Sequence, residues 1–166
     1  TTIMNDFSDL HYRLHIEPDL MQSTFKGRVE IRLHPAAALD QLRLNCLGLD
    51  IDDCRVQDND QPIAAEFELV AADEQLLIKW SEPVMGPLTI AIDYQGPISD
   101  GMAGFYRSGY RVAGQVRPLA ITQFQESDAR RALPCLDHPR HKATFSITLV
   151  VASDQIALSN AAVSEE

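Results

Sequence analysis

The chain has 166 residues with 24 acidic and 14 basic side chains, which gives a formal net charge of −10. This length fits one domain that buries about 70% of the surface its unfolded chain would expose. The acidic balance would repel the phosphate backbone of a nucleic acid, and no basic run offers a local exception, so we expect no nucleic acid partner.

The three cysteines, Cys46, Cys54 and Cys135, are odd in number and lack the spacing of a zinc or redox motif. They favour a reducing compartment and predict small buried apolar side chains rather than disulfides. No apolar run approaches the roughly 20 residues that cross a bilayer, and the N-terminal residues lack the basic and apolar regions of a signal peptide. We therefore expect a soluble, cytoplasmic protein with no membrane partner.

Short segments in which polar and apolar residues alternate predict β-strands along most of the chain. The predicted strands cover residues 10–17, 25–34, 39–45, 47–56, 64–69, 75–80, 88–94, 104–110, 143–152 and 155–159. Turn residues such as Asn59, Asp60 and Pro62 separate them. The spacing predicts an all-β fold, an antiparallel sandwich or saddle of sheets, in a single domain that covers residues 1–166.

Gly27 lies on the apolar side of the second predicted strand, between Phe25 and Val29. A glycine inside a strand is typical of a bulge or of a close approach by another strand. We expect one of these two features at Gly27.

The segment 122–139 breaks the rhythm of alternating strands. Ser127 and Asp128 are residue types that begin helices, and they predict one short helix near residues 127–133 that ends at Pro134. A second proline follows five positions later, and the pair excludes both a helix and a regular ladder there. The sequence therefore predicts a loop of fixed shape after the helix.

This segment resembles, nearly position by position, a stretch near the end of the N-terminal β-domain of the aminopeptidase N family of zinc metallopeptidases, which includes the leukotriene hydrolases. The matching residues are Thr122, Gln123, Gln125, Ala129, Arg130, Pro134, Cys135, Asp137, Pro139, Lys142, Ala143 and Phe145. The strands that contain Tyr12 and Gly27, and the Gly-Phe-Tyr-x-Ser sequence from Gly104, match the same domain. In the family, the Leu-Ser-Asn found here at Leu158 leads out of this domain into the catalytic one.

The resemblance implies zinc chemistry that residues 1–166 do not contain. The family holds zinc with a His-Glu-x-x-His helix and a downstream Glu, because three protein ligands leave one position for the attacking water. None of the five histidines begins that motif, and the Gly-Ala-Met-Glu-Asn substrate sequence of the family is also absent. We therefore expect no catalytic residue and no metal site here, with zinc and catalysis belonging to a separate catalytic domain of the parent enzyme. The chain alone should be inactive.

Two glutamines are the candidate substrate-binding residues, by resemblance. Gln123 and Gln125 correspond to positions where the β-domain meets the catalytic domain, and the position of Gln125 contributes to the pocket for the free α-amino group of a peptide. An amide oxygen can accept a hydrogen bond from an ammonium, which must find such partners when it is buried. The alternative is that both side chains only bond the backbone of their own loop.

Other polar residues have simpler interpretations. Arg130, Asp137 and Lys142 are expected to fix the loop, and Phe105 and Tyr106 are expected in the core. Asp137, His138 and His141 are close enough in sequence to suggest a metal clamp. We interpret them instead as an incidental cluster, because the family has Glu where His138 stands.

Three rival functions stay open at this stage. The first is a stand-alone β-sandwich binding module, and the second is a hydrolase that uses Asp137 and His138. The hydrolase has little support, because no serine or cysteine lies in an activating context. The third is a family member that acts as an epoxide hydrolase or a scaffold, and nothing in these residues separates it from a peptidase.

Overall fold

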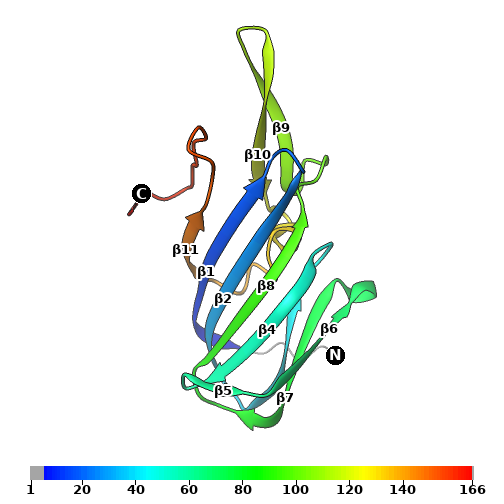
Figure 1. Ribbon diagram of the computed structural model, residues 1–166. Helices are drawn as coiled ribbons and strands as arrows, with labels where there is room; N and C mark the ends of the chain where they lie inside the picture. Colours follow the sequence, from blue (N-terminus) through cyan, green and yellow to red (C-terminus); the bar gives the residue numbers. More distant parts are fainter. Residues whose placement is uncertain (1–5, 166) are drawn as a thin grey trace.

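The computed structural model describes residues 6–165, which form eleven β-strands and two short 3-10 turns (Figure 1). The strands are β1 Phe7–Asp19, β2 Thr24–Pro35, β3 Leu39–Asn45, β4 Asp50–Asp58, β5 Gln61–Ile63, β6 Ala65–Val70, β7 Gln75–Val84, β8 Leu88–Pro97, β9 Gly104–Val112, β10 Gln115–Gln123 and β11 Thr144–Leu149. The 3-10 turns are η1 Ala71–Asp73 and η2 Ala129–Arg131. The all-β prediction is confirmed.

The largest sheet has six strands in the order β11-β1-β2-β8-β4-β5. Its pairs are antiparallel except for β1 and β11, which run parallel with His11 opposite Thr144. The antiparallel pattern that the sequence predicts therefore has one exception among the described strands, at this edge. Alternation of side chains is the same in both directions, so the sequence pattern could not have distinguished a parallel pair from an antiparallel one.

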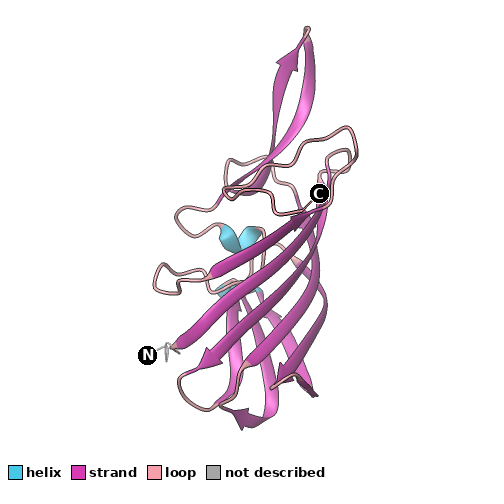
Figure 2. Ribbon diagram, turned by 90° about the vertical axis from the view of Figure 1, so that its left-hand side faces the viewer, coloured by secondary structure: helices cyan, strands magenta, loops and turns pink. Residues whose placement is uncertain are grey.

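A three-stranded sheet in the order β3-β7-β6 packs against one face of the large sheet (Figure 2). Fully buried side chains from both layers meet between them, including Ile90 and Ile92 from the large sheet and Leu44 and Ile78 from the small one. The third sheet is the hairpin of β9 and β10, which projects from one end of the molecule (Figure 1). The core is thus a sandwich with an extended ribbon at one end.

Gly27 lies where another strand approaches closely, as one of its two interpretations predicts. It pairs with Tyr94 of β8, and a Cβ atom at Gly27 would overlap the Tyr94 ring. Tyr94 is buried in the core, and burial raises the pKa of its hydroxyl well above the usual value. The glycine therefore makes room for a buried tyrosine.

The short helix predicted near residues 127–133 is a single 3-10 turn, η2. An α-helix here would require the Arg130 carbonyl to accept from the N–H of residue 134, but Pro134 has none. That carbonyl accepts instead from the Leu47 N–H at 2.9 Å, and the Asp128 side chain accepts from Arg131 Nε rather than capping the turn. The predicted helix is thus reduced to this one turn, because Pro134 and the tertiary hydrogen bond to Leu47 keep it from continuing.

Two predicted strands near the C-terminus also differ from the structure. The strand expected over residues 143–152 is confined to β11, and the strand expected over 155–159 does not form. Ile156 and Leu158 are almost fully exposed. Their alternation is typical of a strand, but a strand also needs a partner for its backbone groups, which the described residues do not supply.

The three cysteines are free and buried, as predicted. Burial raises the pKa of Cys46 to about 11 and that of Cys54 to about 12, and it raises the pKa of Cys135 further. The thiols therefore stay protonated at neutral pH, which suits apolar packing. Within residues 6–165, no helix reaches the length and apolar character that a membrane crossing requires.

Candidate functional site

The candidate site is the segment of residues 122–139, called here the corner. It begins with the last two residues of β10 and lies over the same face of the large sheet as the small sheet does (Figure 2). Asn45, the last residue of β3, fixes its second half. The Asn45 N–H donates to the Cys135 carbonyl at 2.7 Å, and the Cys135 N–H donates back at 3.0 Å. The Asn45 side-chain oxygen also accepts from the Asp137 N–H at 3.1 Å. One residue of the small sheet therefore makes three hydrogen bonds to the corner.

Arg130 joins the two halves of the corner to the turn before β7. Its Nε donates to Asp137 Oδ2 at 2.9 Å, and its Nη1 donates to Glu74 Oε2 at 2.9 Å. The side chains of Arg130 and Asp137 are only 15% and 11% exposed. Burial lowers the pKa of Arg130, but the hydrogen bonds to Asp137 and Glu74 outweigh this and raise it overall. The guanidinium stays charged and acts as a fixed clamp, as predicted for Arg130 and Asp137.

Two tyrosines of the large sheet hold the middle of the corner. The Tyr94 hydroxyl donates to the Ala132 carbonyl at 3.0 Å, and the Tyr12 hydroxyl accepts from the Leu136 N–H at 3.0 Å. Burial raises the pKa of Tyr12, so its hydroxyl also stays protonated. Leu133 lies in the same core cluster as both rings. The corner is thus fastened to both layers of the sandwich.

Gln123 and Gln125 lie at the start of the corner, and both are exposed. Gln123 is the last residue of β10 and pairs with Gly104, and the peptide bond from Gln125 to Glu126 is cis. Among the hydrogen bonds within residues 6–165, none uses the side-chain amide of either glutamine. The arrangement can present two neutral amides, each with an acceptor oxygen and a donor nitrogen, to a neighbouring molecule.

Asp137, His138 and His141 do not form a metal clamp. The Asp137 carboxylate is bound by Arg130, and the two histidine rings lie 6.2 Å apart between centroids. Burial lowers the pKa of His141, and the nearby His138 and Arg140 lower it further. Across the described residues, no three His, Cys, Asp or Glu side chains gather closely enough to hold a metal ion. The residues present here therefore do not fit zinc.

The structure agrees only in part with the roles expected of Phe105, Tyr106 and Lys142. Phe105 is partly buried and packs against the core, with its ring 5.1 Å from that of Phe25. Tyr106 is partly buried as well. Lys142 is exposed, and its backbone N–H donates to the Arg140 carbonyl at 3.1 Å.

Sequence reasoning did not single out the residues that fasten the corner: Tyr12, Asn45, Glu74 and Tyr94. A signal existed for the two tyrosines, because each occupies an otherwise aliphatic position of an alternating strand, and a buried hydroxyl needs a partner. Asn45 and Glu74 gave no such signal. Their contacts depend on how the small sheet packs beside the corner.

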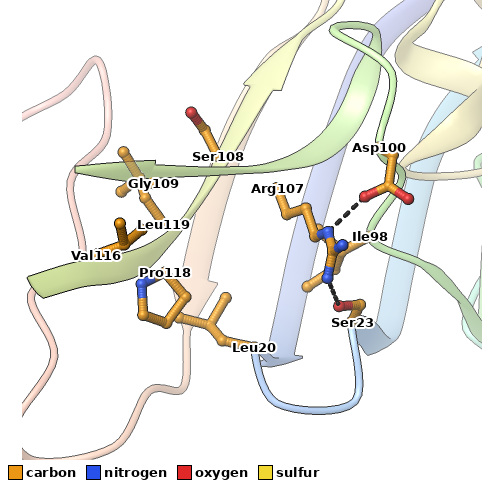
Figure 3. A pocket seen from close by; sticks show the side chains of 10 residues that line it. All are labelled: Leu20, Ser23, Ile98, Asp100, Arg107, Ser108, Gly109, Val116, Pro118 and Leu119. Atoms are coloured by element: carbon orange, nitrogen blue, oxygen red, sulfur yellow. Dashed lines mark hydrogen bonds and ion pairs between the residues drawn. The ribbon is translucent and has the colours of Figure 1, made fainter. Parts of the chain in front are cut away.

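Two surface pockets lie away from the corner. One, of about 400 Å³, lies between the β9–β10 ribbon and the turn after β1, and Arg107 crosses it to reach Asp100 and Ser23 (Figure 3). The other, of about 500 Å³, opens on the polar face of the large sheet beside His11 and His34. Neither of these two pockets is lined by a corner residue.

Sequence comparisons with known proteins identify a family of domains and several relatives. Residues 8–166 match the peptidase M1 N-terminal domain. Aminopeptidase M1-A of Oryza sativa is 40% identical over 163 residues, which cover 93% of this chain and 18% of that protein. Aminopeptidase M1 of Arabidopsis thaliana is 38% identical over 161 residues, with 93% and 18% covered. "Aminopeptidase 2, mitochondrial" of Saccharomyces cerevisiae is 36% identical over 166 residues, with 95% and 17% covered. The chain spans less than a fifth of the length of these relatives, and it belongs to the family of peptidase M1 N-terminal domains.

Proposed function

We propose that this domain is the non-catalytic N-terminal part of a cytoplasmic zinc aminopeptidase that removes single residues from peptide N-termini. Its partners are the catalytic domain of the same protein and the N-terminus of the substrate. The names of the relatives and the small share of their length that the chain covers support this reading. Zinc, when bound in the catalytic domain, would activate the attacking water. The domain alone carries no peptidase activity in this proposal.

Its role in the enzyme is to cap one side of the active-site cleft and to help bind the α-amino group of the substrate. The observation that carries this role is that residues 130–137 of the corner are fastened at five or more points, while the amides of Gln123 and Gln125 in the same segment stay exposed and unused. A rigid support reduces the entropy that is lost when a ligand binds. The Gln125 side-chain oxygen accepts a hydrogen bond from the substrate ammonium, and Gln123 lines the approach.

The test is Gln125→Ala in the full-length protein. A hydrogen bond to a charged group contributes about 1.5–3 kcal/mol, so the KM for peptides should rise about tenfold or more. The fold should not change, because the side chain is exposed. Gln115→Ala, at an exposed glutamine at the tip of the ribbon, is the matched control and should leave the KM unchanged.

A ligand pair sharpens the assignment to the α-amine. The Gln125→Ala variant should bind a free-amine inhibitor more weakly than the parent protein does, and it should bind the des-amino analogue equally well. An unchanged KM and kcat would contradict the proposed role of Gln125. An equal loss of affinity for both inhibitors would assign the residue to another part of the ligand.

A further inference from the structure

The edges of the three sheets differ in how they are protected. An exposed edge strand normally carries a charge or a proline, or is very short, because its free backbone groups would otherwise pair with another chain. The protecting residues are Asp40 and Arg43 in β3, Pro62 in β5, Glu66 and Glu68 in β6, Arg107 and Arg111 in β9, and Arg117 and Pro118 in β10. Among the edge strands within residues 6–165, only β11 has none of these residue types.

One face of β11 is also uncovered. Phe145, Ile147 and Leu149 lie opposite Tyr12, Leu14 and Ile16 of β1, and so continue the buried face of the large sheet. The β1 residues are buried, whereas Phe145 and Ile147 are 55% and 47% exposed. The Phe145 ring stacks on Tyr12 at 5.1 Å, which shows that it faces the core side. The apolar face of the large sheet therefore extends one strand beyond the elements that pack on it.

The backbone of β11 is bonded on one side only. The Val150 N–H donates to the Ile16 carbonyl at 2.9 Å, and β11 ends the sheet order beyond β1. Peptide groups of a strand point alternately to its two sides, so the N–H groups of Phe145, Ile147 and Leu149 point to the open edge. Uncharged, β-branched and aromatic residues with free donors form a surface that readily accepts another strand.

We propose that the open edge and apolar face of β11 are the surface on which the polypeptide after residue 166 packs, which adds a strand at the edge and apolar side chains over the face. This rests on the part of the proposed function in which a larger enzyme contains this domain. Relatives more than five times as long leave ample chain to cover the surface, since this chain covers only 17–18% of their length. Strand β11 is also the last strand within the described residues, and the segment after it lies on the β11 side of the molecule (Figure 1).

A second copy of the same domain is a poorer occupant. Each copy carries a formal net charge of −10, so two copies repel each other at low ionic strength. The segment after β11 also exposes Ile156 and Leu158, so exposed apolar side chains recur along the sequence toward residue 166. The charge and the position in the chain both favour the downstream polypeptide.

Hydrogen exchange of the full-length protein and of the 166-residue chain tests this directly. The amides of Phe145, Ile147 and Leu149 should exchange about 100-fold more slowly in the full-length protein, because they gain hydrogen bonds and cover. Equal exchange rates in the two proteins would overturn the proposal. Protection that appears in the 166-residue chain only as its concentration rises, with no added protection in the full-length protein, would assign the surface to a second copy and overturn it as well.

Substitutions supply an independent readout. Ile147→Lys places a charge on the proposed contact, and it should restore fast exchange across β11 in the full-length protein and speed proteolytic separation of the domain several-fold. Leu69→Lys is the matched control, because Leu69 is 42% exposed on the charged edge strand β6 and should change neither property. If Ile147→Lys fails to fold, Ile147→Ser should show the same changes to a smaller degree.

The outcomes are separable from those of the proposed function. A full-length protein whose β11 amides are protected but which has no peptidase activity would refute the proposed function and retain this inference. A peptidase that responds to Gln125→Ala but leaves β11 in fast exchange, or that tolerates Ile147→Lys as well as Leu69→Lys, would refute only this inference.

Discussion

The corner and β11 differ in opposite directions in their secondary structure and in how well the rest of the domain contacts them. The corner has almost no regular structure, yet side chains and backbone groups from β1, β3 and β8 hold it at defined atoms. Strand β11 is regular, yet its apolar side chains are exposed and one of its edges is open. The difference teaches that contacts within the domain can fix the shape of a segment that belongs to no β-sheet. A regular strand, in contrast, can depend on a partner to bury its apolar side chains.

The largest effect on stability should come from Arg130→Ala, which removes contacts that hold the corner. The substitution leaves the nearly buried Asp137 carboxylate without its guanidinium and should lower the free energy of unfolding by about 3 kcal/mol. Urea unfolding monitored by circular dichroism measures it. The corner would then lose its fixed shape, whereas β11 should keep its pairing with β1.

Arg131→Ala is the matched control for Arg130. Arg131 pairs with Asp128 at 2.8 Å, but its side chain is 47% exposed. Exposed pairs contribute about 0–1 kcal/mol, so its removal should change little. Equal effects of the two substitutions would show that the Arg130 contacts do not fasten the corner.

A smaller effect should follow from Tyr94→Phe. The ring still fills the space that Gly27 leaves, but the Ala132 carbonyl loses its hydroxyl donor, which should cost about 1 kcal/mol. Differential scanning fluorimetry should show a modest decrease in Tm. Tyr110→Phe removes an exposed hydroxyl from the ribbon and should leave the Tm unchanged. A Tyr94→Phe protein as stable as the parent would indicate that the Tyr94 hydroxyl contributes nothing to holding the corner.

Much of the architecture could be predicted from the sequence. Alternation located most of the strands, and Gly27 was expected to mark either a bulge or a close approach, of which the structure shows the close approach of Tyr94. The position of the corner followed from its two prolines, and Arg130 and Asp137 were expected to fix it, although their bond to each other was not foreseen. These features are local, since each depends on a residue type with a strong conformational or bonding preference.

Apart from β10, which pairs with its neighbour β9, the features that sequence analysis missed depend on contacts between distant segments. The helix near residues 127–133 gave way to η2 because Leu47 and Tyr94 bond carbonyls of that segment. Alternation could not reveal that β11 runs parallel to β1, nor that residues 155–159 lack a partner strand. The substrate role of the two glutamines stays a prediction, because it concerns groups outside this domain.

Hydrogen exchange of the 166-residue chain alone tests the central claim, that the domain itself fixes the corner. The account predicts slow exchange at the amides of Leu47, Cys135 and Asp137, which donate to Arg130 and Asn45, and fast exchange at the outward amides of Phe145 and Ile147. Corner amides that exchange as fast as those of β11 would contradict it, because the corner would then need a partner to acquire its shape.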